Sequence, residues 1–285
     1  MTGQIPVLNI GMGPGSQVED ELSYMPMPHE MNTFEVPVLP EPEEVGECPA
    51  ALELLTRLQE ALDGYRVGTP GVVLELDTLP EQALTLLKQI LGEGEVAIQI
   101  GGQRPARIQE TVLAGVWWIH QQLDGADGVA RQWLEVADVP ALAVEQAFAA
   151  ARWPQLDGAD LPADLLNAGP VLVELLDVAR QHAQAPRSLP HVINLSLLPF
   201  SPEDQRYLAA QLGEGCVAVL SRGYGNCRIG STATPGIWRV QYFNSTDQLI
   251  LDTLEVTTIP QVACAAQEDI EDSAERLREI REVLL

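Results

Sequence analysis

The chain has 285 residues, of which 46% are hydrophobic, and its formal net charge at pH 7 is -25. This length is enough for two hydrophobic cores, but no apolar run approaches the roughly 20 residues that cross a bilayer. A surface with this much negative charge repels phosphate backbones and anionic lipids. We therefore expect no nucleic-acid binding and no membrane binding.

Residues 1–47 are expected to form an extended arm. Seven prolines oppose regular helix in this segment, which contains neither lysine nor arginine. Apolar residues between Tyr24 and Leu39 suggest that the arm lies against the body of the protein or is captured by a partner. Its acidity has two interpretations, solubility or attraction to a cationic partner segment.

The rest of the chain contains two similar segments at an offset of 121 residues. Leu91–Ile98 is matched by Leu212–Val219, and Trp117 is matched by Trp238. A register kept over about 100 residues predicts two copies of a module the size of a small domain. We place these modules at 48–151 and 169–285, with a Pro-, Asp- and Gly-rich linker at 152–168.

Each module is predicted to be an α-β-α-β-β-β-β-α unit. In the first module we expect a helix at 49–63, a strand at 71–77, a helix from Pro80, and strands at 95–100, 106–111, 115–121 and 129–136. In the second module the counterparts are 170–183, 191–197, a helix capped by Ser201, and 216–221, 227–232, 236–242 and 248–256. Sequential strands with short turns indicate an antiparallel meander sheet in each module, so the fold class is α+β. The long final helix is expected to pack on the second module.

The four cysteines do not suggest a disulfide framework, and the N-terminus lacks the pattern of a secretory signal, so we expect a cytoplasmic protein. Cys216 and Cys227 occur only in the second module. In the first module the matching positions are occupied by Glu95 and Ala106. Their spacing is not that of zinc or thioredoxin-like motifs, and a small buried residue is the commoner role of a free cysteine. A thiol-dependent enzyme, or an iron–sulfur or metal carrier using Cys227 and Cys216, stays open as the alternative. No catalytic triad or metal motif is present, and we expect no catalytic residues, metal or cofactor.

The second module also contains sequence runs that are more specific than a hydrophobic periodicity: Ser221–Ile229, Trp238–Asn244, Leu249–Val256 and Glu268–Leu277. At the N-terminus they are joined by Gly13–Gln17, Tyr24–Pro28 and Met31. Together these runs resemble the HupH (HyaF) family of hydrogenase expression/formation proteins over nearly the whole chain.

The resemblance implies a non-enzymatic, cytoplasmic maturation chaperone for a [NiFe] hydrogenase. Its expected partner is the iron–sulfur small-subunit precursor, with its twin-arginine leader, before export; thioredoxin-like and rubredoxin-like maturation proteins are possible companions. The resemblance brings no catalytic residues. It offers as candidates for partner contact Tyr224, Asn226, Cys227, Arg228, Asn244 and Glu255. The first module departs from this signature, since Gln103, Pro105 and Ala106 replace Tyr224, Asn226 and Cys227.

Overall fold

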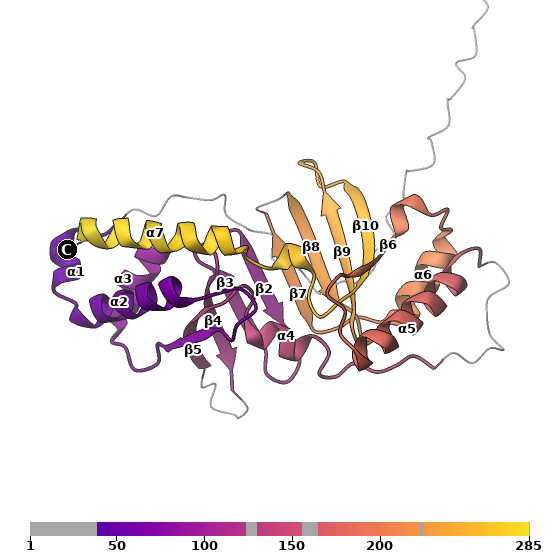
Figure 1. The fold of residues 1–285 in the computed structure, drawn as a ribbon, viewed down its shortest axis with the longest axis horizontal. Helices are drawn as coiled ribbons and strands as arrows, with labels where there is room; N and C mark the ends of the chain where they lie inside the picture. Colours follow the sequence, from indigo (N-terminus) through magenta and orange to yellow (C-terminus); the bar gives the residue numbers. More distant parts are fainter. Residues whose placement is uncertain (1–38, 124–129, 156–164, 223–224, 285) are drawn as a thin grey trace, which may run out of the picture. The chain divides into compact units, whose positions relative to one another are not determined.

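A computed structural model describes residues 39–123, 130–155, 165–222 and 225–284 of the chain. Within these residues the fold is α+β, as predicted, and is built on one antiparallel sheet of ten strands (Figure 1). None of the described helices combines the length and apolar character needed to cross a membrane.

The elements follow the same order in the two halves of the chain. The first half contains α1 (Pro42–Gly46), α2 (Pro49–Gly64), β1 (Val72–Glu75), α3 (Glu81–Leu91), β2 (Val96–Ile100), β3 (Ala106–Glu110), β4 (Val116–Gln122), β5 (Ala130–Val136) and α4 (Ala141–Ala147). The second half contains α5 (Ala168–Gln184), β6 (His191–Asn194), α6 (Pro202–Leu212), β7 (Val217–Ser221), β8 (Asn226–Ser231), β9 (Ile237–Phe243), β10 (Leu249–Val256) and α7 (Gln267–Leu284), with short 3-10 turns at Leu195–Leu197 and Gln261–Ala263. The strand predicted at 191–197 ends early because the Asn194 side chain accepts a 2.9 Å bond from the Ser196 N–H and starts the first of these turns.

The strand order is β1-β5-β4-β3-β2-β7-β8-β9-β10-β6. Each half therefore supplies five neighbouring strands in the same relative order, and β2 pairs with β7 where the halves meet, with Ile98 opposite Val219. The prediction of one meander sheet per module needs correction, because the strands of both halves form one continuous sheet. Pairing β2 with β7 satisfies the backbone groups of two strands that would otherwise be exposed edges.

The repeated Leu-Gly-Glu-Gly turn has a steric explanation. It joins α3 to β2 in the first half and α6 to β7 in the second. A Cβ atom at Gly94 would collide with the Thr111 carbonyl oxygen, and one at Gly215 would collide with the Ser231 hydroxyl. Only glycine allows the backbone to approach so closely at these positions.

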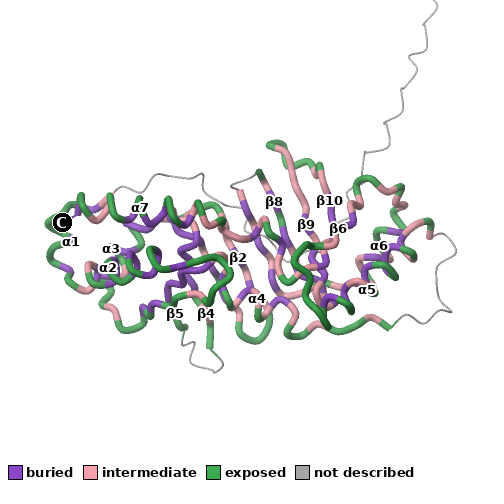
Figure 2. Tube along the Cα trace, in the orientation of Figure 1, coloured by how far each residue is buried: buried purple, intermediate pink, exposed green. Residues whose placement is uncertain are grey.

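Helices pack on the sheet with apolar faces, and Figure 2 shows which of their residues are buried. In the second half, α5 and α6 bury Leu172, Leu175 and Leu208 against Leu254 of β10. In the first half, α2 and α3 contribute the apolar stripes that their helical spacing predicts, from residues such as Leu55, Leu58, Leu87 and Ile90.

The C-terminal helix α7 packs on the first half, contrary to our prediction. Ile270, Ala274 and Leu277 are buried in the same core as α2, and the two helices lie side by side in Figure 1. Gln59 of α2 donates a 3.0 Å bond to the Ala274 carbonyl oxygen. The chain is directed there just before the helix begins, because the Ala265 N–H bonds to the Asp138 carbonyl oxygen at 2.8 Å.

The predicted arm of 1–47 is not extended at its end. Residues Pro42–Gly46 form helix α1, which packs against α2 and α7 and buries Val45. Proline is compatible with this helix because Pro42 occupies its first turn, where the missing N–H has no partner to lose. Residues 1–38 of the arm lie outside the described residues, as do 156–164 of the linker.

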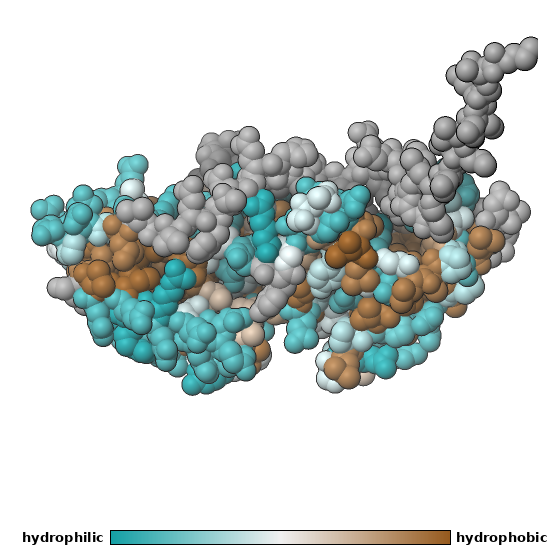
Figure 3. Space-filling view, turned by 90° about the horizontal axis from the view of Figure 1, so that it is seen from above, coloured by the Kyte–Doolittle hydropathy of each residue, from teal (hydrophilic) through white to brown (hydrophobic). Residues whose placement is uncertain are grey.

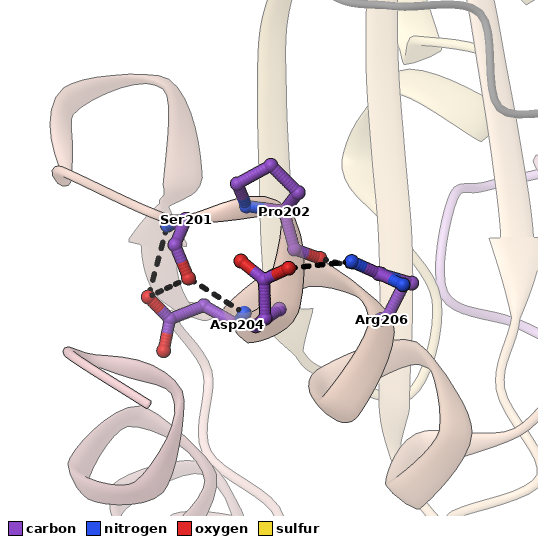
Figure 4. Close-up of polar contacts among 5 residues, drawn as sticks. Ser201, Pro202, Asp204 and Arg206 are labelled. Atoms are coloured by element: carbon purple, nitrogen blue, oxygen red, sulfur yellow. Dashed lines mark hydrogen bonds and ion pairs between the residues drawn. The ribbon is translucent and has the colours of Figure 1, made fainter. Parts of the chain in front are cut away.

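The carboxylate of Asp204 joins the starts of α5 and α6, and Figure 4 shows its contacts with Ser201. Asp204 is fully buried, and its Oδ1 accepts the backbone N–H groups of Leu166, Asn167 and Ala168 at 2.9–3.0 Å. Its Oδ2 accepts the Ser201 N–H at 2.9 Å, while the Ser201 hydroxyl accepts the Asp204 N–H at 3.0 Å and completes a capping box. The backbone bonds hold the pKa of Asp204 at about 2 against the opposing effect of burial.

Candidate functional site

Three of the predicted contact residues meet at one end of the sheet, where β8, β9 and the β9–β10 turn come together. The Asn226 amide donates to the Asp247 carboxylate at 3.4 Å, and the Arg228 guanidinium lies 4.6 Å from the centre of the Phe243 ring. Asn244 orders the turn, because its Oδ1 accepts the N–H groups of Thr246 and Gln248, each at 2.9 Å. Tyr224 lies outside the described residues.

Cys227 points to the opposite face of the sheet from Asn226 and Arg228 because side chains alternate along β8. It pairs with Tyr242 across the strands, and its side chain is fully buried. Burial raises the pKa of the Cys227 thiol to about 12, against a hydrogen bond with Tyr242 that lowers it. Glu255, also predicted as a contact residue, lies close enough for its charge to raise the pKa values of Cys227 and Tyr242. Burial raises the pKa of Glu255 itself.

This environment does not suit thiol chemistry. The thiolate is the reactive form of cysteine, and a thiol with a pKa near 12 is protonated at neutral pH. Reactive cysteines also need access to a substrate, and Cys227 has none of its surface exposed. The residue fits the role of a small buried side chain.

Cys216 and Cys227 do not form a pair. Cys216 precedes β7, whereas Cys227 lies opposite Ser221 at the far end of that strand. At about 3.3 Å per residue the separation is on the order of 16 Å, well beyond the reach of a disulfide. The Cys216 thiol instead donates to the Gln146 carbonyl oxygen at 3.2 Å. Among the described residues no group of His, Cys, Asp or Glu could hold a metal ion.

A pocket of about 420 Å³ lies where the first half, the 262–265 segment and α7 come together. Its lining includes Glu95, Glu110, Trp117 and Asp269. Sequence reasoning missed this site, although one signal was present. The second module has Cys216 and Ser231 at the positions of Glu95 and Glu110, so both carboxylates are particular to the first module.

The exposed surface is hydrophilic over much of the face shown in Figure 3, and its hydrophobic residues gather in separate patches. One group of exposed apolar side chains belongs to the β6 edge and its neighbours, and it comprises Leu189, Val192, Leu197 and Ile250. Leu197 and Leu189 are 80% and 76% exposed.

Comparison with known proteins gives matches over the full length of the chain. The model of the HupH hydrogenase expression protein C-terminal conserved region matches twice, at residues 49–151 and 165–284. The chain is 70% identical to hydrogenase expression/formation protein HupQ of Azotobacter chroococcum mcd 1, over all of both chains. It is 31% identical to hydrogenase-1 operon protein HyaF of Escherichia coli (strain K12), over 94% of each. A solved structure of a hydrogenase expression protein HupH from Thiobacillus denitrificans is 27% identical, with a TM-score of 0.38, and covers 41% of this chain and 95% of its own.

Proposed function

Because the chain belongs to the HupH family of hydrogenase expression proteins, we propose that it is an accessory chaperone in the maturation of a [NiFe] hydrogenase. Its partner in this proposal is the iron–sulfur small-subunit precursor, which it binds in the cytoplasm before export. The observation that carries the proposal is the match, end to end, to relatives named hydrogenase expression/formation proteins.

The charge of the protein supports a polypeptide partner with a basic segment. A net charge of -25 attracts cationic chains over long range and raises their association rate. A twin-arginine leader supplies such a segment. The exposed apolar side chains near β6 offer short-range contact, which charge alone does not provide.

A role in binding, without covalent catalysis, agrees with the burial and the raised pKa values of three of the cysteines. Cys227 is buried with a raised pKa, and burial also raises the pKa values of Cys216 and Cys264. None of these thiols has the lowered pKa that activates a nucleophilic cysteine. These observations favour the chaperone over the thiol-dependent alternative.

We further propose that the two halves are copies of one module and that the second copy makes the partner contacts. The equal strand order and the double match of the family model support the duplication. The signature side chains Asn226, Arg228 and Asn244 stand together at the β8–β9 end of the second half. At the first-half positions that match Asn226 and Tyr224, the chain has Pro105 and Gln103.

The decisive experiment is co-purification of the full-length protein with the small-subunit precursor, with and without its leader. We expect capture of the precursor and at least tenfold less capture once the leader is removed. No capture of either form would refute the proposed function. Equal capture of both forms would keep the maturation role and refute recognition of the leader.

The acidic arm is proposed to assist capture. Removing residues 1–38 tests this role, because the shortened chain keeps helix α1 and its buried Val45. We expect weaker capture at low salt and a smaller difference at high salt, since screening weakens long-range attraction. Unchanged capture after this deletion would exclude the arm. Thioredoxin-like and rubredoxin-like maturation proteins remain proposed further partners, to be sought in the same pull-down.

A further inference from the structure

The two faces of the sheet are covered differently at its centre, where β2, β3, β7 and β8 lie. On one face, Ile98, Ile108 and Val219 of these strands belong to the buried core. On the other face, helices pack towards the two ends of the sheet, with Lys88 of α3 over the Trp118 ring of β4 and with α5 on β10. Figure 1 shows the pairs α2–α3 and α5–α6 on either side of the central strands.

Eight residues of the central strands form what we call the open face. The strand register places them in two rows: one comprises Arg107, Gln99, Ala218 and Gly230, and the other comprises Gln109, Ala97, Leu220 and Arg228. None of the eight is buried, and a Cβ atom at Gly230 would meet no atom from elsewhere in the structure within 4 Å. None is acidic, although the chain has 41 acidic and 16 basic residues. The open face is therefore accessible and does not share the acidity of the chain as a whole.

Two arginines at matching positions of the modules give the open face its charge. Arg107 and Arg228 are exposed and lie on either side of the β2–β7 pair. They are about 14 Å apart across the strands, since three strand spacings of roughly 4.8 Å separate β3 from β8. Within the described part of the chain, neither arginine has a carboxylate oxygen within 4 Å, and neither does Lys88 at the edge of the face. An acidic protein thus presents unneutralised cations at this place.

Trp118 adds a polar group without a partner beside these cations. Only 5% of the residue is exposed, and its Nε1–H has no hydrogen-bond acceptor among the described residues. The His120 ring stacks on it with 6.1 Å between ring centres, and Lys88 Nζ lies 5.6 Å from its ring centre. Buried N–H groups are normally satisfied. An oxygen atom supplied by a bound segment would give this N–H an acceptor next to Lys88.

The second half gives an internal comparison for this corner. Arg239 occupies the position that matches Trp118, and its guanidinium pairs with the Asp252 carboxylate at 2.6 Å. The polar group there already has an acidic partner from the chain itself. In the first half, the residue that matches Asp252 is Gln132, so the corresponding carboxylate is missing from the chain. A carboxylate from another molecule would take its place.

We propose that the open face binds an acidic segment of the polypeptide that the protein chaperones. The inference rests on the proposed function and assigns a second contact, distinct from recognition of the basic leader. Carboxylates pair with arginine in bidentate geometry, and the small residues Ala97, Ala218 and Gly230 let a peptide backbone lie close to the sheet. Nucleic acid is disfavoured, because its dense charge is repelled by a protein of net charge -25.

Because Arg107 and Arg228 come from different halves, the site depends on the pairing of β2 with β7. A segment with two carboxylates can contact both arginines at once. Removing both arginines should therefore weaken binding more than removing either one.

The test uses the full-length protein, the purified small-subunit precursor, and labelled overlapping peptides that cover the precursor sequence. Dissociation constants are compared for the wild type, Arg107→Gln, Arg228→Gln and the double variant. Arg131→Gln is the matched control, because Arg131 lies on β5 on the opposite face of the same sheet, is half-exposed, and removes the same charge. Circular dichroism checks that each variant is folded.

We expect the double variant to bind the precursor and its acidic peptides at least tenfold more weakly. Each single variant should bind severalfold more weakly, and Arg131→Gln within twofold of the wild type. The peptides that bind should lose their affinity when Glu and Asp are replaced by Gln and Asn. A double variant that captures the precursor as well as the wild type does would overturn the open face and leave the proposed function intact. A wild type that captures no precursor would overturn both.

Two further results would assign the open face to another occupant and overturn the proposal. The first is a single-stranded oligonucleotide that binds as tightly as the acidic peptides and is weakened equally by the double variant. The second is a gain of at least tenfold in peptide affinity when residues 1–38 are removed, because this acidic segment of the chain itself would then be the competitor.

Discussion

Replacing Asp204 by asparagine is expected to lower the free energy of unfolding by about 2–4 kcal/mol at pH 7. The fully buried carboxylate accepts four backbone N–H groups and the Ser201 hydroxyl. An amide has one acceptor oxygen, so either the three donors at the start of α5 or those at Ser201 lose their partner. Hydrogen bonds to charged groups contribute roughly 1.5–3 kcal/mol, and a buried donor left unpaired costs roughly 1–3 kcal/mol.

The pKa of Asp204 gives an independent magnitude. It is lowered from the ordinary value of 3.8 to about 2 in the fold, which corresponds to roughly 2 kcal/mol. Since the folded pKa is the lower of the two, this stabilisation is present above pH 4 and is lost as the pH falls towards 2. The difference in the free energy of unfolding between the wild type and Asp204→Asn should therefore shrink to less than about 1 kcal/mol at pH 2.

Urea unfolding followed by circular dichroism at pH 7 and pH 2 measures both quantities. Hydrogen exchange at the amides of Leu166, Asn167 and Ala168 locates the effect. Glu203→Gln is the control, because this neighbouring acid makes a half-exposed ion pair with Arg206 and should change stability by less than about 0.5 kcal/mol. Equal stability of Asp204→Asn and Glu203→Gln at pH 7 would refute the role assigned to the carboxylate. So would a loss of unfolding free energy in Asp204→Asn that is as large at pH 2 as at pH 7.

Two further predictions concern the cores. Cys227→Ser places a hydroxyl in a fully buried site and should cost about 1–3 kcal/mol in urea unfolding, while hydrogenase activity in cells stays normal wherever the variant accumulates. Lost activity with intact stability and partner binding would point to thiol chemistry. Leu277→Ala should cost about 2–5 kcal/mol and reduce hydrogen-exchange protection in α2 of the first half rather than in α5, because α7 packs there. Val283→Ala, at a 63% exposed position of the same helix, is its control, and an equal effect of the two variants would contradict this packing.

The local elements could be predicted from the sequence because their causes are local. Helical spacing of leucines identified α2, the Ser201-Pro202 pair marked the start of α6, and the paired glycines placed both turns before β2 and β7. The equal order of elements in the two halves followed from the register of two similar segments.

The candidate site was predictable only in part. The resemblance alone named Asn226, Arg228 and Asn244 as candidates, and the pairing of β8 with β9 is what brings them to one end of the sheet. The partners of Cys227 could not be predicted in the same way, because strand alternation decides which face a side chain occupies, and a shift of one residue reverses it. Only the register of β8 against β9 shows that the thiol is buried beside Tyr242.

Tertiary structure alone decided three features. An unpaired edge on β2 could accept any strand, so its pairing with β7 was not encoded in either segment alone. The apolar stripe of α7 indicates that one side of the helix is covered, but it does not indicate which half of the protein covers it. The burial of Glu110, and with it the acidic pocket, depends on that long-range choice, because α7 closes over a strand more than 150 residues earlier in the chain.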